Sequence, residues 1–260
     1  MLAILKTLCY NQSRKRKTPL LLCSIHKNKI HKINNGERNM DTKNYVLIGE
    51  AGSGKTEIAA NLALLLARTQ TSPVCLIDMD QTKCLFRARD FSSLLKERHV
   101  HMAENPELWD SPLMPQGVSS LIQDDGVCCV LDAGGNAVGA TMLGQYAELL
   151  AKRQTRYFYV INPCRAFSGS IEDIEESLSA MIISARIPRE RLELIANPFM
   201  GEYTTAELIL EASGHLKEEL AKRGMEISGL AVSETFSGEV KARVPWPVLE
   251  LSTFVDKLYV

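Results

Sequence analysis

One stretch constrains the fold of this chain more than any other: Tyr45–Asn61, which reads YVLIGEAGSGKTEIAAN. Within it, Gly49–Thr56 matches the pattern G-x-x-x-x-G-K-[ST], in which a glycine-rich loop joins a strand to a helix. The apolar run Tyr45–Ile48 is typical of a buried strand, and Glu57–Ala67 carries apolar side chains at helical spacing. We therefore predict a strand, a phosphate-binding loop and a helix in that order.

A loop of this type holds phosphate through its backbone and through two side chains. Glycines let successive backbone N–H groups turn toward one anion, and the positive end of the helix dipole adds to the attraction. We expect Lys55 to reach the β- and γ-phosphates and the Thr56 hydroxyl to hold Mg²⁺. The alternative is a strand-to-helix turn that binds nothing. The predicted nucleotide-binding residues in the loop are Gly49, Glu50, Ala51, Gly52, Ser53, Gly54, Lys55, Thr56 and Glu57.

Two acidic motifs come at the ends of later apolar runs. Asp78 ends the apolar run Val74–Asp78 and Asp80 comes two residues later, while Asp132 directly follows the apolar run Val127–Leu131. Carboxylates at the ends of parallel strands can approach Mg²⁺ and orient a water near the terminal phosphate. Each motif alone also fits a turn with a helix cap. The predicted catalytic residues are Lys55, Asp80 and Asp132, and the predicted magnesium ligands are Thr56, Asp78 and Asp132.

Two glycines follow the second acidic motif. Gly134 and Gly135 permit a close approach of backbone to the terminal phosphate, because they carry no Cβ. We expect the N–H of Gly135 to respond to the presence of the γ-phosphate.

Strands and helices alternate from Met40 onward. Short apolar strands separated by helices predict a three-layer α/β fold, a doubly wound and mainly parallel sheet flanked by helices, with ligands bound at the carboxyl ends of the strands. Residues 99–118 are expected to be irregular. The further strands expected are Val74–Asp78, Val127–Leu131, Tyr157–Ile161, Leu192–Ala196 and Ile227–Val232; the further helices are Phe91–Lys96, Ala140–Lys152, Ile171–Ala185 and Thr204–Arg223, the last broken near Ser213-Gly214.

The first 39 residues differ in composition from the rest. Residues 1–39 carry nine Lys or Arg and one acidic residue, a charge of +8, whereas residues 40–260 carry 21 basic and 30 acidic residues, a charge of −9. We expect residues 1–39 to be a disordered extension, with Met40 as the natural start and residues 40–260 as the nucleotide-binding domain. An organelle transit peptide and a nucleic-acid-binding arm are the alternatives for the extension. The acidic remainder predicts no nucleic-acid partner.

The cysteines and the C-terminus bear on the compartment. The chain has seven cysteines without disulfide-framework spacing, and Cys75, Cys128 and Cys129 lie in apolar runs, so we expect reduced, buried thiols of a cytoplasmic protein.

The apolar positions at the C-terminus have only Lys257 as a basic neighbour, so we expect them to pack on the domain rather than insert into a membrane. They are Leu249, Leu251, Phe254, Val255 and Leu258.

In this order the motifs resemble the MinD/ParA class of P-loop ATPases (the SIMIBI class), which includes the nitrogenase iron protein and the cobyrinate and dethiobiotin synthetases. The resemblance runs from about Val46 to about Val232, through GEAGSGKTEIAANLA, VCLIDMDQ, VCCVLDAGG, VINP and LIANP. It implies a P-loop NTPase fold with ATP and Mg²⁺ as cofactors. It also implies that Asp80 activates the attacking water, that Asp78 lies near Mg²⁺ and that Asn197 hydrogen-bonds the base and favours adenine.

A closer similarity is to a group of small ATP-binding proteins of the CobQ/CobB/MinD/ParA nucleotide-binding type, which has no assigned reaction. Three further stretches carry it, namely Phe86–Asp90, Asp132–Ala140 and Gly201–Thr205. Nothing about a substrate follows from this similarity.

At one position the loop departs from the class. The class commonly has a second lysine early in the loop that reaches the nucleotide of a dimer partner, and Glu50 occupies that position here. A carboxylate cannot neutralise phosphate, so we expect no catalytic homodimer of that kind unless another cation acts, and Arg87 and Arg89 are candidates. A solvated helix face is the alternative for these two arginines.

Three functions remain open from the sequence. We favour a slow ATPase, stimulated by an unidentified protein partner, whose loops at Asp80 and Gly135 respond to ATP and its hydrolysis. One alternative is an ATP-dependent ligase or kinase acting on a small molecule. The other is a nucleotide-binding module with negligible turnover.

Overall fold

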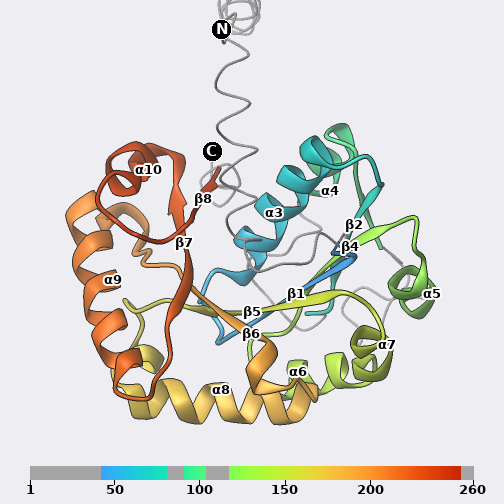
Figure 1. Ribbon diagram of the computed structural model, residues 1–260. Coiled ribbons are helices and arrows are strands. Elements are labelled where there is room, and N and C mark those ends of the chain that lie inside the picture. Colours follow the sequence, from blue (N-terminus) through green and yellow to red (C-terminus); the bar gives the residue numbers. More distant parts are fainter. Residues whose placement is uncertain (1–41, 81–90, 104–116, 253–260) are drawn as a thin grey trace, which may run out of the picture. The chain divides into compact units, whose positions relative to one another are not determined.

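The computed structural model describes residues 42–80, 91–103 and 117–252. Within these residues, eight strands form one sheet in the order β3-β2-β4-β1-β5-β6-β7-β8, and every pairing is parallel (Figure 1). The predicted doubly wound α/β fold is therefore confirmed. The strands are β1 (Asn44–Ile48), β2 (Val74–Asp78), β3 (Val100–Met102), β4 (Cys128–Asp132), β5 (Thr155–Ile161), β6 (Leu192–Ala196), β7 (Ile227–Ser233) and β8 (Val248–Leu251).

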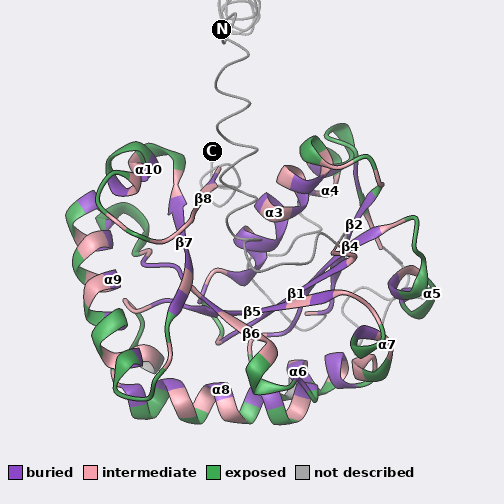
Figure 2. Cartoon of the chain, in the orientation of Figure 1, coloured by how far each residue is buried: buried purple, intermediate pink, exposed green. Residues whose placement is uncertain are grey.

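Helices cover both faces of the sheet, which explains why its central strands are continuous apolar runs (Figure 2). One face packs on Ile58 and Leu66 of the helix that follows the glycine loop, and the other packs on Leu143 and Leu178 from later helices. The helices are α3 (Lys55–Thr69), α4 (Ser92–Glu97), α5 (Val118–Gln123), α6 (Ala137–Gly144), α7 (Ala147–Ala151), α8 (Ile171–Ala185), α9 (Ala206–Ala221) and α10 (Glu234–Lys241), with short 3₁₀ turns η3 (Ala166–Ser168), η4 (Arg189–Arg191) and η5 (Gly201–Tyr203).

Part of the stretch predicted to be irregular is regular. β3 pairs in parallel with β2, with Val74 opposite Val100, and α5 begins at Val118. A three-residue strand with one buried side chain leaves no apolar run in the sequence, so the pattern could not reveal it. The remainder of that stretch, residues 104–116, lies outside the described residues.

The helix predicted over Ala140–Lys152 is two helices, α6 and α7. α6 begins earlier than predicted because the Asn136 side chain accepts a hydrogen bond from the Gly139 N–H at 2.8 Å, as a helix cap. α6 ends at Gly144, where a methyl group would lie 2.4 Å from the carbonyl oxygen of Ser184 in α8. This close contact with α8 requires glycine, and the apolar pattern alone does not show it.

The break predicted near Ser213-Gly214 is wrong, because α9 is continuous. The Ser213 hydroxyl donates to the Ile209 carbonyl within the helix at 2.6 Å. A methyl group at Gly214 would meet nothing within 4 Å, so no close contact requires glycine there, and it weakens the helix without interrupting it.

The C-terminal apolar positions fall in two groups. Leu251 is buried at the end of β8, and Leu249 packs partly buried on the core, in line with the expected packing on the domain. Residues 253–260, with Phe254, Val255 and Leu258, lie outside the described residues. No helix in the described ranges is long and apolar enough to cross a bilayer.

The cysteines that the structure describes are free thiols, as predicted. Burial raises the pKa of Cys75 to about 11 and that of Cys128 to about 12, and it also raises the pKa of Cys129. These thiols are therefore protonated near neutral pH.

Candidate functional site

The glycine loop leaves β1 at the centre of the sheet and enters α3. Gly49, Gly52 and Gly54 have φ values of 144°, 76° and 92°, a region that favours glycine. Space is restricted as well: a methyl group at Gly49 would lie 2.4 Å from the Val160 carbonyl oxygen in β5. The loop therefore has both the backbone conformation and the close packing that its glycines predicted.

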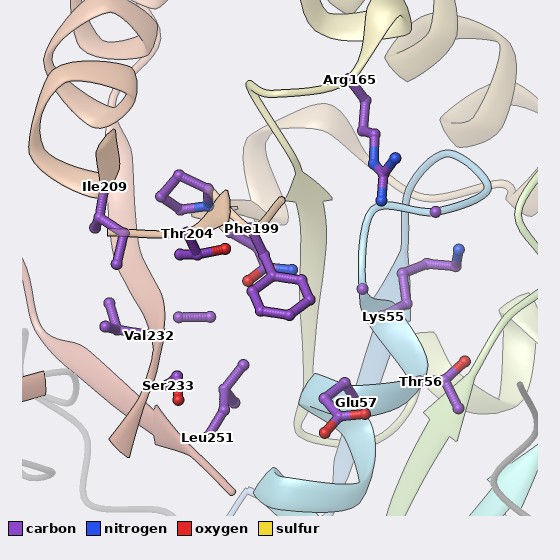
Figure 3. Close-up of a pocket in the computed structure, with 15 residues that line it drawn as sticks. Lys55, Thr56, Glu57, Arg165, Phe199, Thr204, Ile209, Val232, Ser233 and Leu251 are labelled. Carbon is purple, nitrogen blue, oxygen red and sulfur yellow. The ribbon is translucent and has the colours of Figure 1, made fainter. Parts of the chain in front are cut away.

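Lys55 and Thr56 begin α3, and both are buried. The Lys55 ammonium donates a hydrogen bond to the backbone carbonyl of Glu50 at 3.0 Å, so its side chain folds back over the loop (Figure 3). The ammonium is therefore held against the backbone of the glycine loop. This is the arrangement expected of a phosphate-binding loop.

The acidic motifs meet at the same edge of the sheet. Asp78 of β2 and Asp132 of β4 are in register, and Asp132 is also paired with Leu47 at the end of β1. The backbone N–H of Asp80 donates to Oδ1 of Asp78 at 2.9 Å, which ties the backbone at Asp80 to the first carboxylate. Strand ends therefore bring together residues far apart in the sequence.

These residues have the chemistry for a magnesium ion. Asp78 is 9% and Asp132 is 1% exposed, and Thr56 lies in the first turn of α3, directly after the glycine loop. Mg²⁺ in nucleotide sites takes one or two protein oxygens, completing its shell with water and phosphate. Thr56, Asp78 and Asp132 would supply such oxygens, and bound Mg²⁺ would neutralise charge on the phosphates. No cluster of three or more His, Cys, Asp or Glu occurs among the described residues, so a metal site made of protein ligands alone has no support there.

The loop after β4 lies directly on the glycine loop. A methyl group at Gly135 would lie 2.7 Å from Cα of Ala51, and one at Gly134 would lie 2.8 Å from Cα of Gly139. The same position at Gly134 is 3.7 Å from Cγ of Asp80. Gly134 and Gly135 thus join the first turn of α6 to the glycine loop and to Asp80.

Glu50 points its carboxylate toward α8. The Ser177 hydroxyl donates to the Glu50 carboxylate, and it shares a second hydrogen bond of 2.8 Å with the Tyr159 hydroxyl. Burial raises the pKa of Tyr159 to about 12. Glu50 therefore connects the glycine loop to β5 and α8, a role that the sequence did not indicate.

Asn197 follows β6 and is also tied to the glycine loop. Its side-chain amide donates to the Ser53 carbonyl at 2.8 Å, and its nitrogen is where a methyl group at Gly54 would lie, 2.1 Å away. The amide retains a second N–H and its oxygen, so a contact with a base is compatible with this bond. The structure adds to Asn197 a part in supporting the loop.

A cavity of about 270 Å³ extends from the glycine loop toward β6, β7 and α9 (Figure 3). Its far wall is mainly apolar and comes from strand ends, which is where ligands bind in sheets of this type. Arg165, Phe199 and Val232 carry no motif in the sequence, and only their places at or after the ends of β5, β6 and β7 could have pointed to them. The lining residues are Gly52, Gly54, Lys55, Thr56, Glu57, Arg165, Asn197, Pro198, Phe199, Thr204, Ile209, Ala231, Val232, Ser233 and Leu251. Arg87 and Arg89 lie outside the described residues.

A comparison with protein families matches residues 45–234 to the CobQ/CobB/MinD/ParA nucleotide binding domain. The chain belongs to this family. It therefore has a P-loop nucleotide-binding domain of the MinD/ParA class, as the motifs predicted. None of the curated protein sequences compared with the chain matches it.

Solved structures similar to the chain are distant. The cell division protein FtsY of Thermotoga maritima is 16% identical with a TM-score of 0.46, over 79% of this chain and 68% of that one. The signal recognition particle 54 kDa protein of Aeropyrum pernix K1, solved with GDP, is 13% identical with a TM-score of 0.45, over 88% of this chain and 53% of that one. FlhF, solved with GTP and Mg²⁺, is 17% identical with a TM-score of 0.39, over 74% of this chain and 70% of that one.

Proposed function

We propose that the protein is a Mg·ATP-dependent switch that hydrolyses ATP slowly and passes its nucleotide state to a protein partner. The observation that carries this proposal is the close approach of Gly135 to Ala51 and the position of Gly134 beside Asp80. A terminal phosphate held by the glycine loop would meet the backbone of this region. Its presence or absence would then change the conformation of the first turn of α6.

ATP is proposed on the basis of Asn197 and the cavity. Asn197 stands at the position where the MinD/ParA class contacts the base, and it lines the cavity together with Phe199 and Val232. A largely apolar cavity suits the faces of a purine, and the amide can exchange hydrogen bonds with its edge. Comparison of ATP with GTP tests this assignment.

Slow turnover follows from the environment of Glu50. Glu50 is a carboxylate, hydrogen-bonded by Ser177, where the class commonly has a lysine, so this position brings no positive charge to the phosphates. Asp80 remains to orient the attacking water, while the stimulus would come from a partner protein rather than from a second copy of the chain. The ligase and kinase hypothesis has no described feature in its favour.

Equilibrium binding tests the proposal. Calorimetric titration should show binding of Mg·ATP to the full chain, weaker binding of Mg·GTP, and loss of binding in Lys55→Ala. Lys217→Ala is the matched control, because Lys217 is an exposed lysine on α9 about two turns beyond Ile209. Equal affinity of Lys55→Ala and the unchanged chain for Mg·ATP would contradict the proposal, and so would the absence of nucleotide binding in either.

A further inference from the structure

Arg165 is a charged side chain on the cavity that the proposed mechanism does not yet use. It follows β5 at the start of η3, and its exposed guanidinium makes no hydrogen bond or ion pair with the described part of the chain. Figure 3 shows the side chain extending from its turn toward the glycine loop. Gly52 and Lys55 line the same cavity.

The turn that presents Arg165 is fixed by Asn162, which is 2% exposed. The Asn162 side-chain oxygen accepts from the Cys164 N–H at 3.0 Å, and its carbonyl accepts from the Arg165 N–H at 3.1 Å. The Asn162 amide donates to the Phe199 carbonyl at 2.9 Å, across to the segment after β6. The backbone of Arg165 is therefore positioned by a buried side chain, not by a free loop.

Among the described residues that line the cavity, the cationic side chains are those of Lys55 and Arg165. A nucleotide diphosphate or triphosphate carries several negative charges, and Glu50 supplies none of the compensation. A guanidinium presents paired N–H donors in a plane that matches two phosphate oxygens. An unengaged arginine beside a phosphate loop thus has both the charge and the geometry for that ligand.

We infer that Arg165 contacts the α- and β-phosphates of the bound nucleotide from within the same chain. The cavity runs from the glycine loop toward Phe199 and Val232, whereas Asp80 and Gly135, where the terminal phosphate is expected, do not line it. Arg165 therefore meets the phosphates nearest the nucleoside. The inference rests on the proposed nucleotide binding, and it supplies in cis the charge that Glu50 does not bring.

The test is the affinity of the full chain for Mg·ADP and for Mg²⁺ with a non-hydrolysable ATP analogue, measured by calorimetry. Arg165→Ala should weaken both by about tenfold, the loss of one charge-assisted contact. Arg165→Lys should recover part of that loss, because it restores charge without the paired donors. Lys217→Ala, which removes an equal charge elsewhere, should stay within about twofold of the unchanged chain. The thermal midpoints without nucleotide should agree, since the guanidinium bonds to no described residue.

The possible results distinguish the role of Arg165 from the proposed nucleotide binding. Binding by the unchanged chain together with equal affinity in Arg165→Ala would overturn the role of Arg165 and leave the proposed function standing. A loss confined to the ATP analogue would place Arg165 at the γ-phosphate and contradict the α,β assignment. No binding of either nucleotide to the unchanged chain would overturn the proposed function and the role of Arg165 with it.

Discussion

Among single residues, Asp80 and Asp132 should have separable roles. Asp80 lies against Gly134, whereas Asp132 is buried in register with Asp78. We expect Asp80→Ala to keep ATP affinity and lose hydrolysis by roughly 10²-fold, the loss of a water-orienting group. We expect Asp132→Ala to weaken the dependence of ATP affinity on Mg²⁺. Steady-state hydrolysis and titrations with and without Mg²⁺ measure the two effects.

Asp80→Asn is the matched control for the first substitution, because it keeps the shape of the side chain and removes its charge. It should behave as Asp80→Ala does in hydrolysis. Equal hydrolysis rates for the unchanged chain and both variants would show that Asp80 takes no part in turnover.

At the scale of elements, two helical glycines offer a contrast. A methyl group at Gly139 in α6 would lie 2.5 Å from Cα of Gly134, while one at Gly214 in α9 would meet nothing within 4 Å. Gly139→Ala should lower the free energy of unfolding by about 1–3 kcal/mol and displace the region that contacts the glycine loop, reducing ATP affinity. Gly214→Ala should raise the free energy of unfolding by about 0.5–1 kcal/mol with ATP affinity unchanged.

Urea unfolding followed by circular dichroism, with parallel ATP titrations, measures both changes. The contrast fails if the two variants move stability in the same direction. It also fails if Gly139→Ala lowers stability but binds ATP as tightly as the unchanged chain.

Some strands and helices could be predicted from the sequence and others could not. β1, β2 and β6 were predictable because buried parallel strands are continuous apolar runs, and the boundaries of α8 were predictable from its apolar period. β3 and β8 were not, because edge strands of three and four residues leave no such run. The end of α6 depends on the contact of Gly144 with Ser184, which only the fold creates.

The candidate site divides in the same way. Lys55, Thr56 and the carboxylates stand in motifs whose spacing has a chemical reason, so they were predictable. Arg165, Phe199 and Ser177 are single residues after strands or on a helix, with no motif to mark them. They join the site because parallel strands end at one edge, and because α8 packs beside the glycine loop.

At the scale of the whole molecule, stability should fall at alkaline pH. Burial raises the folded-state pKa values of Cys75 and Cys128 to about 11 and about 12, above the ordinary thiol value of 9.0. Below pH 9 both states hold these protons; above it the unfolded chain ionises first, so unfolding becomes more favourable until the pH passes the folded-state values. Urea midpoints from pH 8 to 10 should decline, and Cys128→Ala should decline less steeply. An identical decline in this variant would contradict the assignment.

The basic extension, residues 1–39, should contribute nothing to the stability of the fold. Residues 1–39 have a net charge of +8 and no apolar period, so we expect them to bury too little surface to offset their ordering entropy. A chain that begins at Met40 should melt within experimental error of the full chain by differential scanning calorimetry. A large drop in melting temperature would show that the extension takes part in folding.

Amide hydrogen exchange of the full chain, with Mg·ADP and with Mg²⁺ plus a non-hydrolysable ATP analogue, tests whether residues 134–140 respond to the terminal phosphate. A response is expected there because Gly135 lies against Ala51 and Gly134 against Gly139. We predict slower exchange in this segment with the ATP analogue than with ADP, and no nucleotide effect in Lys55→Ala. Identical exchange in the two nucleotide states, with both shown to be bound, would contradict the proposed switch.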